Sequence, residues 1–145
     1  MRALPQDPHL LIVHTDGASR GNPGPAGIGV VVTDPSGTIV AELAQGIGRA
    51  TNNVAEYRAA IEGLRLAREH GASSVTLRAD SLLLIEQLAG RYRVKTPHLR
   101  PLFDEARGLI RGFDEVRLEH VPRAENAEAD ALANRGVDAM LEDEA

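Results

Sequence analysis

The sequence of 145 residues contains no cysteine, and aromatic residues make up only 3% of it. Without cysteine the chain can form neither a disulfide nor a thiolate metal site, which makes a cytoplasmic location the default expectation. The shortage of aromatic residues predicts a core of Leu, Val, Ile and Ala. No apolar run approaches the roughly 18 residues of a membrane-spanning helix, and the N-terminal stretch MRALPQDPHLLIV lacks the pattern of a signal peptide. We therefore expect a single domain with no membrane association.

Acidic residues outnumber basic ones, and the formal net charge is −5. Taken alone, this negative charge disfavours non-specific binding to nucleic acid. The charges are unevenly distributed, however. The segment RYRVKTPHLR contains four basic residues and no acid: Arg91, Arg93, Lys95 and Arg100. All charged residues after residue 136 are acidic. The sequence therefore has one local basic patch on an otherwise acidic chain.

Hydrophobic periodicity divides the chain into five strands and four helices. Strands are predicted over 10–16, 27–33 and 38–45, with a glycine- and proline-rich loop over 17–26 and a short DPSG turn at 34–37. A helix over 53–71, a strand over 74–80, helices over 81–90 and 97–112, a strand over 115–121 and a helix over 126–140, capped by Asn126, follow. This order, βββαβααβα, predicts an α/β fold: a five-stranded mixed sheet flanked by helices.

Four acidic residues stand where one edge of such a sheet can collect them. Asp16 and Asp80 end the first and fourth strands, and ligands of α/β sheets bind at the carboxyl ends of strands. Glu56 and Asp130 lie in the first turns of two helices, among small apolar residues. Each helix position also has a structural alternative. Asp80 can be an N-cap, and Glu56 can form a capping box with Asn53. Asp130 can be a partner of the helix dipole.

Four carboxylates at one edge repel one another. At an effective dielectric constant near 20, two charges about 4 Å apart cost about 4 kcal/mol, so some must be protonated or share a cation. Mg²⁺ and Mn²⁺ prefer hard oxygen ligands. Two such ions about 3.5–4 Å apart form the arrangement that catalyses in-line displacement at phosphorus. The acids therefore predict a site for Mg²⁺ or Mn²⁺ that holds two ions when substrate is bound.

Four segments, in this order and spacing, closely resemble the ribonuclease HI family: TDGASRGNPGPAGIGVVV, TNNVAEYRAAIEGL, LRADSLLLIEQL and HVPRAENAEADALAN. The resemblance covers residues 10–137. It implies that Asp16, Glu56, Asp80 and Asp130 are the family's catalytic, metal-binding acids. It also implies an endoribonuclease that cuts the RNA strand of RNA/DNA hybrids, leaving 5′-phosphate and 3′-hydroxyl ends, with double-stranded RNA as a side substrate to be tested. Residues 10–138 would then form the catalytic domain, 1–9 an N-terminal extension and 139–145 a frayed acidic tail.

The resemblance further implies substrate contacts in the loop after Asp16 and at the start of the next helix. The residues concerned are Gly17, Asn22, Thr51, Asn52 and Asn53. Amide side chains and backbone N–H groups can bind the 2′-hydroxyl that distinguishes RNA from DNA. A glycine-rich loop lets a minor groove approach the backbone closely.

The sequence departs from the family pattern in three places. The basic protrusion of some members is reduced here to Arg91, Arg93 and Lys95. We expect this patch to contact phosphates of the DNA strand, the alternative being a solvated loop. Leu82 stands where the family often has glutamine, which removes one polar contact. Well-known members carry a mobile histidine before the last acid; here we expect Arg123 to act as the auxiliary group, with His120 as the alternative.

Two other functions are compatible with this fold. One is a catalytically silent module that binds RNA or hybrids, and the other is a nuclease with a different substrate, such as double-stranded RNA. The complete set of four acids disfavours the first, and the TNN and GNPGP segments favour ribonuclease H over transposase-like relatives. We expect a monomer whose partner is an RNA/DNA hybrid, with no obligate protein partner.

Overall fold

The computed structural model describes residues 9–144; residues 1–8 of the predicted N-terminal extension and Ala145 lie outside the described residues. The strands in this part of the chain are β1 (Leu10–Ser19), β2 (Gly24–Thr33), β3 (Ile39–Ala50), β4 (Ser74–Ala79) and β5 (Glu115–His120). The helices are α1 (Asn52–Glu69), α2 (Leu82–Leu88), α3 (Arg100–Arg111) and α4 (Ala127–Glu144), with short 3₁₀ helices η1 (Pro97–Leu99) and η2 (Arg123–Asn126). The predicted order βββαβααβα is confirmed.

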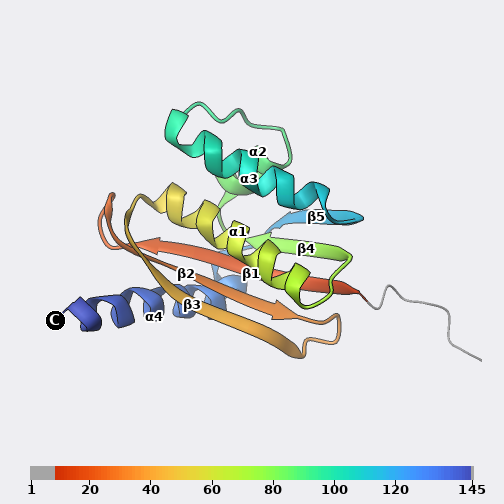
Figure 1. The fold of residues 1–145 in the computed structure, drawn as a ribbon, viewed down its shortest axis with the longest axis horizontal. Helices are drawn as coiled ribbons and strands as arrows, with labels where there is room; N and C mark the ends of the chain where they lie inside the picture. Colours follow the sequence, from red (N-terminus) through yellow and green to blue (C-terminus); the bar gives the residue numbers. More distant parts are fainter. Residues whose placement is uncertain (1–8, 145) are drawn as a thin grey trace, which may run out of the picture.

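All five strands form one mixed sheet with the order β3-β2-β1-β4-β5 (Figure 1). β1, β2 and β3 pair antiparallel as a meander, while β4 pairs in parallel with both β1 and β5. The predicted five-stranded mixed sheet is therefore confirmed. Because β1 lies at the centre of the sheet, the polar residues near its carboxyl end are brought to the middle of the molecule.

The hairpin between β1 and β2 is longer than its glycine and proline content predicts. Most of the expected loop 17–26 belongs to the two strands, which pair from Gly17↔Ile28 to Ser19↔Ala26. Only residues 20–23 remain in the turn. Glycine and proline have low strand propensity, but pairing with a neighbouring strand overrides that preference here.

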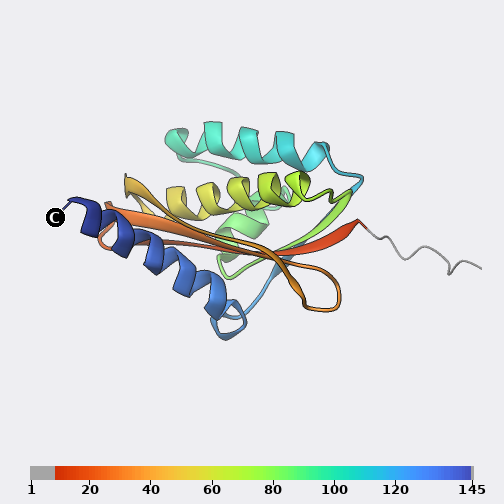
Figure 2. The ribbon, with the colours of Figure 1, turned by 60° about the horizontal axis from the view of Figure 1, so that its bottom comes forward.

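Helices cover both faces of the sheet. Figure 2 shows α1 and α3 on one face and α4 on the other. The core between α1 and the sheet is aliphatic, as the composition predicts, with Tyr57 as its largest fully buried side chain. No helix in the described part of the chain is both long enough and apolar enough to cross a membrane.

α4 packs unusually close to the sheet at two glycines of β2. A Cβ atom on Gly29 would lie only 2.0 Å from the carbonyl oxygen of Ala129, and one on Gly27 would lie 2.4 Å from that of Ala133. The helix backbone therefore rests directly on the strand backbone. This contact fixes the position of the first turns of α4, where Asp130 lies.

Two of the capping roles considered as structural alternatives for the acids are not found. The N-cap of α1 is Thr51, not Asn53, and the Thr51 hydroxyl accepts a hydrogen bond from the backbone N–H three residues on at 3.2 Å. The N-cap of α2 is Ser81, not Asp80, with a hydroxyl bond of 3.2 Å in the same pattern. In both helices the last residue with an extended backbone carries a hydroxyl side chain, which makes the capping hydrogen bond. The side chain of Asp80 is therefore not needed as a cap.

The last helix differs from prediction at both ends. Asn126 directly precedes α4, but its Oδ1 accepts no capping hydrogen bond, and the residue is buried at the end of η2. At the other end α4 continues to Glu144, whereas the acidic composition predicts a frayed tail. The acidic residues 142–144 are exposed on the last helical turn, so their charges remain solvated without leaving the helix.

Candidate active site

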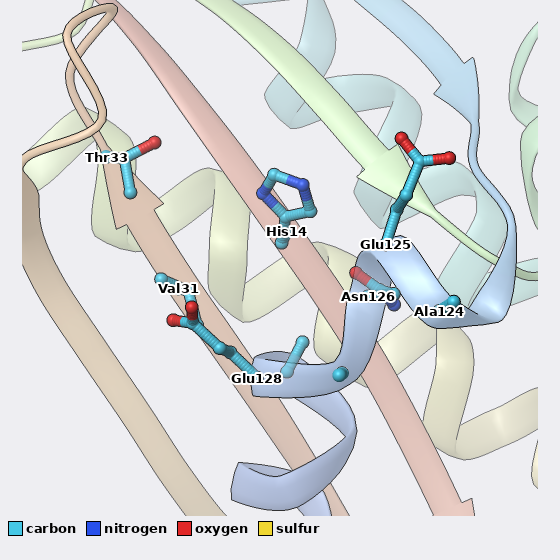
Figure 3. Close-up of a pocket in the computed structure, with 9 residues that line it drawn as sticks. His14, Val31, Thr33, Ala124, Glu125, Asn126 and Glu128 are labelled. Atoms are coloured by element: carbon cyan, nitrogen blue, oxygen red, sulfur yellow. The ribbon is translucent and has the colours of Figure 1, made fainter.

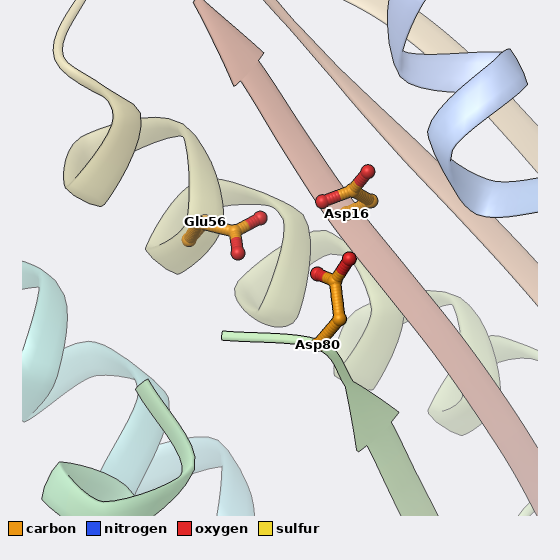
Figure 4. Close-up of side chains that lie close together, drawn as sticks. All are labelled: Asp16, Glu56 and Asp80. Atoms are coloured by element: carbon orange, nitrogen blue, oxygen red, sulfur yellow. The ribbon is translucent and has the colours of Figure 1, made fainter. Parts of the chain in front are cut away.

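A cleft opens where the parallel strands β1 and β4 separate at their carboxyl ends. The last residues that pair across the two strands are Thr15 and Ala79. The next residues in each strand direction are Asp16 and Asp80, which lie side by side (Figure 4). The cleft has a volume of about 760 Å³ and is open to solvent. The predicted meeting of these two acids at one sheet edge is therefore present.

Glu56 reaches the same point from the first turns of α1 (Figure 4). Its Oε1 accepts a hydrogen bond from the backbone N–H of Gly17. α1 lies so close to β1 that a Cβ atom on Gly17 would be 2.3 Å from the carbonyl carbon of Ala55. The glycine therefore admits the helix that carries Glu56, and its N–H is already used inside the protein.

The carboxylates of Asp16, Glu56 and Asp80 form a compact group in which one oxygen of each lies within 4.8 Å of the others. Asp16 is only 6% exposed. Burial raises the pKa of Asp16 well above its usual range, and the negative charge of Glu56 adds to this effect. Burial also raises the pKa of Glu56. Both raised pKa values mean that ionising these carboxyl groups is unfavourable as long as no positive charge lies beside them.

The fourth acid, Asp130, comes from the face of the sheet opposite α1. It lines the same cleft, and its side chain adds to the rise in the pKa of Asp16. The compact group of three does not include Asp130. The four predicted acids thus meet at one cleft, with three close together and the fourth at their side.

The donor set of this cleft fits a hard divalent cation. All four candidate ligands are carboxylates, which suit Mg²⁺ and Mn²⁺ better than softer metals. A cation between them would offset both the burial of Asp16 and the repulsion from its neighbours, the two causes of its raised pKa. The observation behind this fit is the crowding of acids around a nearly buried carboxyl group.

Comparison with known proteins identifies the family of this chain. A family profile described as "Reverse transcriptase-like" matches residues 14–136. Ribonuclease HI of Halobacterium salinarum is 51% identical over 123 residues, which cover 85% of this chain and 62% of that protein. The crystal structure of RNase H1 from the same archaeon superposes with a TM-score of 0.88, covering 90% of this chain and 98% of that one. This chain belongs to the ribonuclease H family.

Two further ribonuclease H relatives are similar in sequence and fold. Bifunctional protein Rv2228c of Mycobacterium tuberculosis is 49% identical over 133 residues, 91% of this chain and 36% of that protein, and its N-terminal RNase H domain superposes with a TM-score of 0.86. LC11-RNase H1, isolated from compost and solved in complex with an RNA/DNA hybrid, is 41% identical with a TM-score of 0.86, covering 90% of this chain and 99% of that one. This chain spans about a third of the mycobacterial protein.

The predicted substrate residues of this ribonuclease H gather at the start of α1. Asn52 and Asn53 are exposed and line the cleft. Asn22, in the hairpin turn, accepts a hydrogen bond on its Oδ1 from the backbone N–H of Asn52 at 3.1 Å. The hydroxyl of Thr51 is occupied as the cap of α1. The side-chain amides of Asn52 and Asn53 are therefore exposed polar groups in the same cleft as the acids.

Both candidates for the auxiliary group of ribonuclease H line the cleft. His120 ends β5, and its Nε2 lies 3.2 Å from the backbone carbonyl oxygen of Asp80. Arg123 begins η2 and is exposed. The cleft therefore accommodates either assignment, and His120 is already engaged with the turn that carries Asp80.

The basic patch is smaller than its sequence indicates. The guanidinium of Arg91 binds both carboxylate oxygens of Glu86, at 2.7 and 2.6 Å. The turn at Gly90, which has a positive φ of 82°, brings the chain back so that these side chains meet. Arg91 is therefore ion-paired with Glu86, which precedes the basic segment, and its contact with DNA phosphates stays a prediction. Arg93 and Lys95 line a groove of about 530 Å³ that also includes Asn53.

Two buried amides near the cleft are not found by the sequence reasoning. Gln87 accepts a hydrogen bond from the Tyr57 hydroxyl at 2.6 Å and donates one to the carbonyl oxygen of Arg93 at 3.1 Å. Asn126 donates to the carbonyl oxygen of Thr15 at 2.9 Å. The position of Gln87 in the apolar stretch LLLIEQL is a sequence signal for a buried amide. No local pattern indicates that Asn126 bonds Thr15.

Proposed function

We propose that this chain is an endoribonuclease that hydrolyses the RNA strand of RNA/DNA hybrids with divalent metal ions, leaving 5′-phosphate and 3′-hydroxyl ends. The observation that carries the proposal is the meeting of Asp16, Glu56 and Asp80 within 4.8 Å in an open cleft. Membership of the ribonuclease H family supports it. LC11-RNase H1, which is 41% identical, was solved with an RNA/DNA hybrid.

The residues proposed to hold two ions, Mg²⁺ or Mn²⁺, with substrate bound are Asp16, Glu56, Asp80 and Asp130. Bound divalent ions lower the pKa of a water molecule and stabilise negative charge on a leaving oxygen. The protein supplies the fixed geometry of the carboxylates. Gly17 orients Glu56 through its N–H, while the parting of β1 and β4 leaves room for a phosphodiester between Asp16 and Asp80.

Recognition of the hybrid is proposed to use two neighbouring surfaces. Asn52 and Asn53, with Gly17, Asn22 and Thr51 around them, are proposed to face the RNA strand, because amides can bind a 2′-hydroxyl. Arg93 and Lys95, with Arg91 held by Glu86, are proposed to face phosphates of the DNA strand. Asn53 lines both surfaces and so connects them.

A gel assay with one labelled RNA strand tests this function. The strand is presented alone, paired with RNA and paired with DNA, each with Mg²⁺, Mn²⁺ or EDTA. We expect metal-dependent cutting confined to the hybrid and absent in Asp80→Asn, with 5′-phosphate ends on the products. Cutting of the RNA duplex as well would assign a broader nuclease. Binding without cutting in either metal would contradict the proposal and favour a silent binding module.

We also propose that the enzyme acts as a monomer in the cytoplasm. All four acids and the proposed recognition residues come from one chain, which supports a site that needs no partner subunit. The absence of cysteine from the sequence agrees with a reducing compartment. The mass measured by light scattering, with and without hybrid, checks the oligomeric state.

A further inference from the structure

We propose that Asn126 is a positioning residue for the cleavage reaction, because a hydrogen bond from its buried amide fixes the catalytic end of β1 to the segment that carries Arg123 and Asp130. The inference rests on the proposed function, since it assigns a role within that reaction. It adds a residue that touches none of the acids and that belongs to neither recognition surface.

Asn126 lies at the junction of three parts of the site. It is the last residue of η2, three residues after Arg123, and it lies four residues, about one helical turn, before Asp130. Figure 3 shows it beside β1, next to His14, where η2 passes into α4. Its side chain is only 1% exposed.

The hydrogen bond of Asn126 ends at a critical point of β1. Its Nδ2 donates to the carbonyl oxygen of Thr15 at 2.9 Å. Thr15 is the last residue of β1 that pairs with β4, and the next residue is Asp16. The amide therefore holds β1 at the place where the two strands part. Because Asn126 directly precedes α4, the same hydrogen bond also fixes the distance between the start of α4 and Asp16.

Among the described residues, only one end of the Asn126 amide has a hydrogen-bond partner. The other end of the amide, Oδ1, is buried without a hydrogen-bond partner among the described residues. A buried unpaired acceptor costs free energy that an aliphatic side chain of similar size would not. What asparagine supplies and leucine lacks is the N–H donor toward Thr15. The donor therefore explains the residue, and its target is the strand end that carries Asp16.

Two variants with the same number of side-chain heavy atoms as asparagine remove this donor. Asn126→Leu leaves the site uncharged, whereas Asn126→Asp places an acceptor opposite the Thr15 carbonyl. Each is assayed for hybrid cleavage over a range of Mg²⁺ concentrations, well below its melting temperature. Val137→Ala serves as the matched control, because Val137 is fully buried on α4 two turns beyond Asp130 and its truncation lowers stability by leaving a cavity.

We expect both Asn126 variants to fold and to lose about 10²-fold in kcat, the effect of a small misplacement of reacting groups. KM for the hybrid should change little, because the recognition residues at the start of α1 are not tied to Asn126. The Mg²⁺ concentration for half-maximal activity should rise. Val137→Ala should lose stability and keep its kcat.

Several results would overturn this role. One is a kcat near that of the parent protein in either folded variant, and another is a kcat of Val137→Ala that falls in parallel with its melting temperature. Failure of both Asn126 variants to fold would make the amide structural. In the unmodified protein, absence of a scalar coupling between Asn126 Nδ2 and the Thr15 carbonyl carbon by NMR would remove the hydrogen bond itself. If the unmodified protein cuts no hybrid, the proposed function fails instead.

Discussion

Several groups act on the single carboxyl group of Asp16. Burial raises its pKa most, and the charges and hydrogen bonds of Glu56 and Asp130 and the charge of Asp80 raise it further. The folded protein without metal therefore keeps a carboxyl group where ionisation is unfavourable. At the residue scale, the site is arranged for a cation at the expense of the stability of the metal-free protein.

Asp16→Asn should make the metal-free protein more stable. An acid whose folded-state pKa lies above its ordinary value of 3.8 contributes full stability below that value and loses it as pH rises toward the folded pKa. Asparagine does not ionise, so the variant avoids this loss of stability at high pH. In EDTA, the melting temperature of the variant should exceed that of the parent by a few degrees at about pH 8 and converge near pH 4. Identical melting curves at both pH values would contradict this expectation.

Gly17→Ala should disturb both stability and activity. The new Cβ would lie 2.3 Å from the backbone of α1, so α1 or β1 must move, at a cost of about 1–3 kcal/mol, and Glu56 moves with it. Gly108→Ala is the control, because its Cβ meets nothing within 4 Å and lies on α3, where alanine is a better helix former. Thermal melts and hybrid cleavage together check this; a Gly17→Ala enzyme indistinguishable from the parent would refute the close-packing argument.

Arg123→Ala should lower kcat partially, by less than the roughly 10²-fold that a direct general acid or base contributes. His120→Ala is the paired variant, because His120 lines the same cleft but contacts the backbone of Asp80. Single-turnover and steady-state rates on the same hybrid separate chemistry from product release. A larger loss in His120→Ala than in Arg123→Ala would transfer the auxiliary role to the histidine.

At the scale of elements, α2 links the acids to the basic patch. It begins with the Ser81 cap directly after Asp80, and Gln87 in its last turn holds the backbone of the following loop through Arg93. The same glutamine is held by Tyr57 of α1, the helix that carries Glu56. One short helix therefore sets the distance between the cleft and the groove lined by Arg93 and Lys95.

Gln87→Leu should raise KM for the hybrid several-fold while kcat changes little, because the loop is released but the acids stay in place. The unpaired Tyr57 hydroxyl should also lower stability by about 1–3 kcal/mol. Tyr57→Phe is the matched variant, since it removes only the bond to Gln87 and leaves the bond to Arg93. Michaelis parameters for both variants check this, and an unchanged KM in Gln87→Leu would show that the glutamine does not order the loop.

For the whole molecule, the balance of charge makes two basic residues important. The net charge is −5, and Arg91 is neutralised by Glu86. Arg93 and Lys95 are then the exposed cations of the groove beside the cleft. Attraction of a polyanion by this acidic protein therefore depends on a small local surface rather than on its overall field.

Substituting Arg93 and Lys95 together with alanine should weaken hybrid binding and reduce the slope of log affinity against log salt by about 2. Cleavage at saturating hybrid should be little affected. Replacing Arg68 and Arg111 together with alanine provides the control for net charge, because both are exposed arginines in the last turns of α1 and α3. An equal change in slope for this control would mean that the groove has no special role.

The topology and the four acids could be predicted from sequence because their signals are local and repeated. Strand and helix periods predict the order of elements. The four acids lie inside sequence motifs that identify them directly: Asp16, Glu56, Asp80 and Asp130. The caps Thr51 and Ser81 lie one or two residues from the alternatives Asn53 and Asp80, since neighbouring polar side chains can each serve as a cap. Local patterns cannot arbitrate such competition.

Other features depend on contacts between distant segments. The bond from Asn126 to Thr15 joins residues 111 positions apart, and the bond from Gly17 to Glu56 joins residues 39 apart. The pairing of Arg91 with Glu86 depends on a turn between them. In each case the sequence shows a polar residue, but only the folded chain shows its partner.

The two helices that bring Glu56 and Asp130 to the cleft each touch the sheet through peptide groups as well as through side chains. At Gly17 the neighbour is the backbone of Ala55, and at Gly29 it is the carbonyl of Ala129. The spacing of the carboxylates is therefore inherited from peptide geometry. A side chain larger than hydrogen at Gly17 or Gly29 would push a helix away from the sheet and carry a carboxylate with it, so these two positions set the dimensions of the site.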